Sequence, residues 1–195
     1  MHLSLESFLL SIVNAYKKMI QRLIKAFYRV FMSPKKYAQY IGVKIGKNCF
    51  IATKNWSSEP YLIEIGDNVQ ITRNVSVHTH GGGHVVRGKH PNYDSFGKVI
   101  IKDGAYIGAF SQIMPGVTIG KGALVAAGSI VTKSVPDGVV VAGNPAKFVC
   151  TVDEYIERNE KYNMGTKGLS YDAKKKALLN MEESKFIKKG YIKIN

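Results

Sequence analysis

The sequence predicts an all-β core in the form of a parallel β-helix, with a helical segment before it and helices after it. Two columns of residues support this prediction. An aliphatic residue recurs every six positions at Ile101, Ile107, Ile113, Ile119, Val125 and Val131. A small or β-branched residue follows four positions later each time, at Ala105, Ser111, Val117, Ala123, Ser129 and Val135. A six-residue period fits neither a helix nor a hairpin protein, but it fits coils built from three short strands and three corners.

The same period appears earlier in the chain, which extends the predicted β-helix over residues 41–149. Ile65, Ile71 and Val77 repeat it, and Ile45 and Ile51 begin it before an irregular piece over 54–62. Aliphatic residues three repeats apart should stack in successive coils, about 4.8 Å apart. Glycine follows several of them, where a tight corner would crowd a larger side chain. These glycines are Gly46, Gly66, Gly108 and Gly120.

Residues 1–40 form a predicted amphipathic helical segment. Apolar residues recur at helical spacing from Leu3 to Phe31, basic residues lie between them, and Ser33-Pro34 ends the pattern. We expect the apolar face either to pack on protein, including a neighbouring subunit, or to lie on an anionic membrane. The uncharged stretch is too short to span a bilayer, and no signal peptide is evident.

Residues 150–195 form a predicted helical extension. Helices are expected over 152–162, capped by Thr151 or Asp153, and over 173–187.

The chain is strongly basic, which indicates an anionic partner. Its 195 residues contain 28 Lys+Arg against 14 Asp+Glu, a formal net charge of +14. Coenzyme A, a phospholipid surface or nucleic acid would each fit. Nucleic acid is not expected, because no recognisable binding module accompanies the charge. The two cysteines form no disulfide framework, so a cytoplasmic setting is the simplest, with membrane association left open.

The repeat fails between Val77 and Ile101, which predicts a loop inserted at about 78–98. This loop holds four of the five histidines: His78, His80, His84 and His90. Loops on rigid scaffolds often carry the chemistry. We expect no bound metal, because residues at alternate positions of an extended segment, such as His78 and His80, point to opposite faces and few other ligands join them.

Several motifs resemble those of the hexapeptide-repeat acyltransferases, especially the sugar O-acetyltransferases related to galactoside and maltose acetyltransferases and found in capsule and lipopolysaccharide gene clusters. The resemblance covers about 41–162. It is strongest in Pro115-Gly116-Val117-Thr118-Ile119-Gly120, Gly128-Ser129-Ile130-Val131-Thr132-Lys133 and Gly143-Asn144-Pro145-Ala146-Lys147. Thr79-His80-Gly81-Gly82 and Asp94-Ser95-Phe96-Gly97 resemble the active-site loop, although Gly81 stands where the family usually has Asp. The resemblance implies a left-handed coil and a homotrimer.

The resemblance also implies roles for individual residues. His80 matches the general base, and Ala109 matches the residue whose N–H faces the thioester. The spacing adds that Ala109 and Ala127, which are three repeats apart, stack and leave a groove for the pantetheine arm of acetyl-CoA. Thr132, Lys133 and Lys147 would follow towards the nucleotide end, where cations suit phosphates. The acceptor would be contacted by other loop residues: His78, His84, Arg87 and Asp94.

The function predicted is acetyl transfer from acetyl-CoA to a hydroxyl of a sugar or polysaccharide precursor, with a histidine as general base. Two alternatives share the fold. One is an N-acetyltransferase acting on an amino sugar or an antibiotic. The other is a protein of the same architecture without transferase activity, either carbonic-anhydrase-like or a scaffold. A carbonic anhydrase of this fold would require three histidines around a metal.

Overall fold

The computed structural model describes residues 5–191, with side chains from residue 8 onward. The chain forms two compact units, Met1–Val149 and Cys150–Asn195. The described part of the first unit contains α1 (Leu5–Phe31), α2 (Pro34–Tyr40), the 3₁₀ turn η1 (Pro60–Leu62) and the short α3 (Gly83–Val86). No helix within the described residues is long and apolar enough to cross a membrane.

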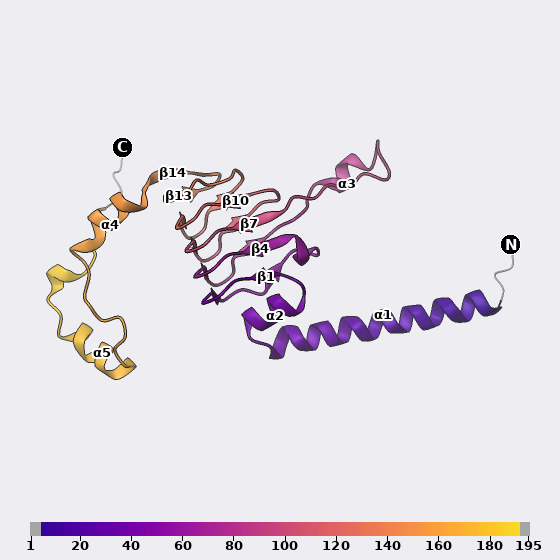
Figure 1. Ribbon diagram of the computed structural model, residues 1–195, viewed down its shortest axis with the longest axis horizontal. Helices are drawn as coiled ribbons and strands as arrows, with labels where there is room; N and C mark the ends of the chain where they lie inside the picture. The colour runs from indigo at the N-terminus through magenta and orange to yellow at the C-terminus, as the bar shows by residue number, and fades with distance from the viewer. Residues whose placement is uncertain (1–4, 192–195) are drawn as a thin grey trace. The chain divides into compact units, whose positions relative to one another are not determined.

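Three sheets build the β-helix, and from β1 to β12 each coil adds one parallel strand to each sheet (Figure 1). The first sheet, A, contains β1 (Lys44–Ile45), β4 (Ile63–Ile65), β7 (Val99–Ile101) and β10 (Thr118–Ile119). Sheet B contains β2 (Phe50–Ile51), β5 (Gln70–Ile71), β8 (Tyr106–Ile107), β11 (Leu124–Val125), β13 (Val139–Gly143) and β14 (Ala146–Thr151). Sheet C contains β3 (Asn55–Trp56), β6 (Ser76–Val77), β9 (Gln112–Ile113) and β12 (Ile130–Val131).

The aliphatic column forms the core of this coil. Ile101 pairs with Ile119, Ile107 with Val125 and Ile113 with Val131, so each aliphatic residue stacks on the one three repeats later. All six side chains are fully buried. The second column is buried as well, and its serines satisfy their hydroxyls by donating to the carbonyl of Ala126. Both predicted columns therefore point inward, as the two-column pattern predicted.

The glycines at the corners are explained by backbone crowding. A Cβ on Gly120 would lie 2.4 Å from the backbone nitrogen of Asp137, and one on Gly108 would lie 2.4 Å from that of Ala127. Atoms of the next coil therefore occupy the space that any side chain would need, and only glycine lets the coils stack at this spacing.

The repeat is interrupted at two places, and both bear on the site. Ile45 pairs with Ile65, and their separation in sequence is slightly larger than three regular repeats because the irregular piece 54–62 lengthens the first coil. Ile65 pairs with Ile101, a separation twice that of the regular repeat, because the loop 78–98 leaves the coil and returns to it. The loop contains the short helix α3, which no pattern in the sequence predicted.

The second unit contains α4 (Val152–Glu160), α5 (Tyr171–Leu179) and the 3₁₀ turn η2 (Glu183–Lys185). Thr151 caps α4 through a reciprocal pair of hydrogen bonds with Glu154, so Thr151 is the cap of the two residues considered. The prediction of one helix over 173–187 was wrong. The helix begins earlier, behind the Ser170 cap, and ends at Leu179, followed by the cap residue Asn180, whose N–H donates to the carbonyls of Leu178 and Lys176.

Candidate active site

The candidate active site lies where the loop 78–98 leaves the coil after β6. The two stems of the loop pair at their base, through an antiparallel bridge between His80 and Phe96 and a 2.7 Å hydrogen bond from the Gly97 N–H to the Thr79 carbonyl. A Cβ on Gly97 would lie 2.2 Å from the backbone nitrogen of Gly116. The base of the loop is therefore packed directly on the Pro115-Gly116 corner of the next coil.

His80 forms a close pair with Glu59, a residue that no sequence motif marked. The His80 Nδ1 atom lies 2.7 Å from Glu59 Oε2. The Thr79 hydroxyl donates to the same oxygen at 2.9 Å, and Thr79 is fully buried. Ser57 Oγ lies 2.7 Å from that hydroxyl and 3.4 Å from His80 Nδ1. The carboxylate is thus held by two donors and extends towards the imidazole from the irregular piece 54–62.

The environment of Glu59 keeps it ionised. Burial alone would raise its pKa, but hydrogen bonds from Thr79, His80 and Ser58 and the nearby charge of His80 together lower the pKa below its ordinary value. An ionised carboxylate only accepts hydrogen bonds, so the Nδ1 atom of His80 must carry a proton. In the neutral imidazole the other nitrogen, Nε2, is then the basic one. The pair therefore sets the tautomer that a general base requires.

His80 borders a pocket with a cavity volume of about 470 Å³. The pocket lies between the loop base and the neighbouring coil, and the ring of Phe96 meets the imidazole edge-to-face with centroids 5.8 Å apart. Its lining consists of His80, Gly81, Gly82, Ser95, Phe96, Gly97, Met114, Pro115 and Gly116. The side chain of His80 is 41% exposed, so a molecule from solution can reach it.

The other loop residues predicted to bind an acceptor do not line this pocket. Arg87 is engaged within the loop, since its guanidinium lies 3.4 Å from Asp94 and its Nε donates to the Tyr93 carbonyl. His84 is exposed on α3. His78 is half-buried, and its Nε2 atom is buried with no hydrogen-bond partner among the described residues.

The residues predicted to bind acetyl-CoA lie at two different corners of the coil. Ala109 and Ala127 follow β8 and β11, whose register stacks them at the corner after sheet B, and the Gly128 N–H donates to the Ala109 carbonyl. Thr132 and Lys133 follow β12, at the corner after sheet C, where His78 follows β6. Lys147 lies in β14 and is exposed. Within one chain, the alanine corner and the histidine corner are therefore separated by a full strand of the coil.

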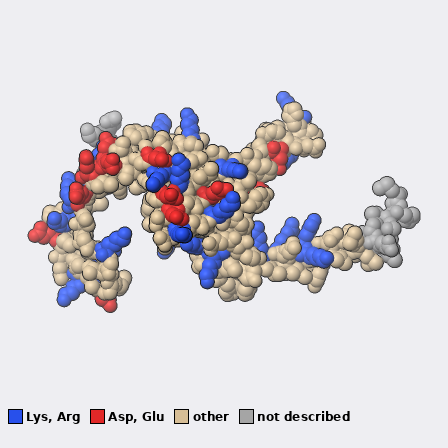
Figure 2. Space-filling view, in the orientation of Figure 1, with Lys and Arg blue, Asp and Glu red and all other residues tan. Residues whose placement is uncertain are grey.

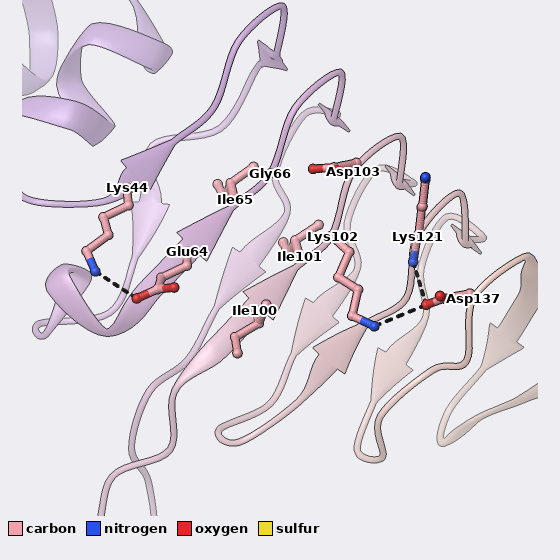
Figure 3. Close-up of a pocket in the computed structure, with 10 residues that line it drawn as sticks. All are labelled: Lys44, Glu64, Ile65, Gly66, Ile100, Ile101, Lys102, Asp103, Lys121 and Asp137. Atoms are coloured by element: carbon pink, nitrogen blue, oxygen red, sulfur yellow. Dashed lines mark hydrogen bonds and ion pairs between the residues drawn. The ribbon is translucent and has the colours of Figure 1, made fainter.

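Another pocket, of about 510 Å³, lies over the outer face of sheet A, and two of its lysines are paired with carboxylates (Figure 3). Lys44 lies 2.8 Å from Glu64, and Lys102 lies 3.3 Å from Asp137. The hydrogen bond from Lys44 lowers the pKa of Glu64. The backbone N–H of Lys121, and then Lys102, lower the pKa of Asp137. Because the Asp137 carboxylate also links two coils, we interpret this face as structural.

No cluster of three or more His, Cys, Asp or Glu side chains that could hold a metal ion occurs within residues 5–191. In that part of the chain, the loop histidines do not converge with carboxylates on one point, apart from the single pair formed by His80 and Glu59.

Comparisons with known proteins agree with this architecture. Residues 98–133 match the family model described as bacterial transferase hexapeptide (six repeats). Protein CapG of Staphylococcus aureus is 45% identical over 147 residues, which cover 72% of this chain and 84% of that protein. The galactoside O-acetyltransferase of Escherichia coli is 36% identical over 127 residues, which cover 64% of this chain and 62% of that protein.

Solved structures share the fold. A hexapeptide-repeat acetyltransferase from Vibrio cholerae superimposes with a TM-score of 0.55 at 21% identity, over 72% of this chain and 92% of that one. A galactoside acetyltransferase in complex with coenzyme A gives a TM-score of 0.52 at 23% identity, over 72% and 84%. The fold and these matches define a transferase built on hexapeptide repeats. The chain belongs to the hexapeptide-repeat acyltransferase family, as the sequence motifs predicted.

Proposed function

We propose that the chain is an acetyl-CoA-dependent O-acetyltransferase that acts on a hydroxyl of a sugar or polysaccharide precursor, with His80 as general base on a left-handed coil. The observation that carries the proposal is the pair of His80 and Glu59 in a pocket on a transferase fold. A relative named for galactoside O-acetylation supports a sugar as the acceptor.

In the proposed reaction, His80 Nε2 removes the proton of the acceptor hydroxyl as its oxygen attacks the thioester carbonyl carbon. Glu59 holds the Nδ1 proton and stabilises the imidazolium that forms. A new C–O bond forms and the C–S bond breaks. His80 then returns the proton to the leaving sulfur, so the products are the acetyl ester and free coenzyme A, and no acyl-enzyme is needed.

The remaining parts of the site are assigned to a second copy of the chain. The N–H of Ala109 has no acceptor among the described residues, so it is free to donate to the developing oxyanion. Because the Ala109 corner lies a full strand away from His80 in one chain, we propose a homotrimer in which one copy supplies the histidine corner and its neighbour supplies the alanine groove. Thr132, Lys133 and Lys147 would then approach the phosphates of acetyl-CoA.

The proposed setting is the cytoplasm, since Cys49 and Cys150 are free thiols, which a reducing compartment preserves.

The test is thiol release from acetyl-CoA with a panel of sugars, amino sugars and simple amines. His80→Ala should lower turnover by about 10²–10⁴-fold while acetyl-CoA binding persists. His78→Ala and His84→Ala are matched controls from the same loop and should lose far less. A large loss in either control with an active His80 variant would refute the assignment, and faster acetylation of amines would refute the hydroxyl acceptor. A monomeric mass by light scattering would refute the trimer.

A further inference from the structure

The helix α1 has a broad apolar face that the rest of its unit leaves exposed. At about 100° per residue, its large exposed apolar side chains, Leu10 apart, occupy an arc of roughly 160°. Each side chain in this arc is between 39% and 71% exposed. These residues, which we call the apolar face of α1, are Phe8, Leu9, Ile12, Val13, Tyr16, Met19, Ile20, Leu23, Ile24, Phe27, Val30 and Phe31.

Between residues 8 and 31, every charged residue on the rest of the circumference of α1 is basic. It holds five basic residues and, from residue 8 to residue 31, the chain has no Asp or Glu. They are Lys17, Lys18, Arg22, Lys25 and Arg29. Figure 2 shows the blue side chains gathered along one edge of α1, with tan surface beside them.

The aromatic contact and the hydrogen bonds between the described part of α1 and the rest of its unit use no side chain of the apolar face. The ring of Tyr28, which lies outside the apolar arc, meets Tyr40 edge-to-face with centroids 4.7 Å apart. Lys54 Nζ donates to the backbone carbonyls of Arg29 and Val30. These contacts hold only the last turn of the helix, so the apolar face is available to another surface.

We propose that α1 docks the protein on an anionic phospholipid membrane and lies in the plane of its interface. An apolar face rich in Leu and Phe, opposed by a face of Lys and Arg, is the pattern of helices that bury one side among acyl chains. The basic residues would lie level with the headgroups and attract acidic lipids. With 27 residues, α1 would extend about 40 Å along the surface.

Charge and width favour a membrane over a second copy of the same helix. A coiled-coil seam is a narrow stripe flanked by residues of both signs, which form pairs between helices. The apolar arc of α1 is far wider than such a stripe, and between residues 8 and 31 its flanks carry only positive charge. Helices packed side by side would bring like charges together, whereas an anionic surface complements all five.

The test is co-sedimentation of the full chain with vesicles, and it does not depend on catalytic activity. The chain should bind vesicles containing roughly one-third phosphatidylglycerol and bind pure phosphatidylcholine only weakly. Each basic residue near such a surface adds about fivefold to binding, so Lys18→Gln, Arg22→Gln and Lys25→Gln together should weaken it by roughly a hundredfold. Leu9→Ser with Leu23→Ser should abolish binding to both kinds of vesicle.

A matched variant controls for net charge. Lys174→Gln, Lys175→Gln and Lys185→Gln remove the same charge from exposed positions of the second unit and should leave vesicle binding within about twofold. Equal binding to neutral and acidic vesicles, or an equal loss in this control, would overturn the proposal. So would a lower mass by light scattering in the Leu9/Leu23 variant with unchanged vesicle binding, because the apolar face would then join copies of the chain.

Discussion

Replacing Glu59 with glutamine tests whether this carboxylate acts through His80. The substitution keeps the size of the side chain and leaves an oxygen that can still accept a hydrogen bond from the Nδ1–H group of His80. What it removes is the negative charge 2.7 Å from the imidazole. The variant should therefore fold and bind acetyl-CoA as the wild type does, and lose stabilisation only where positive charge develops on His80.

The expected magnitude follows from the contact. A hydrogen bond to a charged group contributes about 1.5–3 kcal/mol. The His80 side chain is 41% exposed, so solvent screens part of this energy and the lower half of the range applies. A loss of about 1.5–2 kcal/mol corresponds to a fall in kcat of roughly 10- to 30-fold. The KM for acetyl-CoA should change little, because Glu59 does not line the pocket.

The assay is steady-state thiol release, with Glu64→Gln as the matched control. Glu64 also forms a close pair with a basic group, Lys44 at 2.8 Å, but on the outer face of sheet A, and its variant should keep full activity. A fall of less than about twofold for Glu59→Gln would refute the role of the carboxylate. A fall as large as that of His80→Ala would mean that Glu59 itself transfers the proton.

The lowered pKa of Glu59 gives this variant a second readout. The carboxylate stabilises the fold fully above its ordinary pKa of 4.5, and this contribution is lost as the pH falls through the lower folded-state value. Below pH 4.5, the wild type should therefore lose stability faster than Glu59→Gln in acid unfolding monitored by circular dichroism.

Two other predictions follow from the structure. Lys133→Ala and Lys147→Ala should each raise the KM for acetyl-CoA several-fold with little change in kcat, and less so at high salt, since exposed contacts with phosphate are screened. If both variants still discriminate fully against a dephospho-CoA thioester, neither lysine grips the 3′-phosphate. Gly120→Ala should lower stability by about 1–3 kcal/mol or more, because its Cβ would meet backbone at 2.4 Å. Gly88→Ala, with ordinary contacts at 3.7 Å, is the control in thermal melts, and an equal shift in both would refute the crowding argument.

The core of the coil could be predicted from the sequence because each hexad places one aliphatic residue in the same environment. Ile101, Ile119 and their equivalents are the inward-facing members of their short strands, so the period is dictated by burial. The extent of α5 could not be predicted in this way. None of its residues is buried, so no periodic pattern marks where the helix ends, and the local cap at Asn180 decides it.

The contact between Glu59 and His80 could not be predicted from the six-residue repeat. Glu59 lies in the irregular piece that lengthens the first coil, and His80 lies where the inserted loop doubles the separation between paired strands. Both residues therefore lie in segments where the six-residue period does not predict the position of a side chain in the coil. The one available signal was chemical: Gly81 replaces the acid that usually follows the histidine in the resembling family. The proposed base therefore lacks the acidic neighbour usual in that family, and the structure identifies Glu59 as its carboxylate partner.

The two interruptions of the coil explain why the site forms at this point and not at another corner. At regular corners the period fixes where each residue lies, and at Gly120 and Gly108 the next coil approaches so closely that no side chain fits. The extra residues at 54–62 and at 78–98 release the backbone from this constraint on two successive coils. Glu59 lies in the first of these irregular segments and His80 in the second. The buried hydroxyl of Thr79 holds the Glu59 carboxylate next to His80. Restoring the regular repeat at either place would remove one member of the pair, so the chemistry proposed for His80 and Glu59 depends on these two irregular segments.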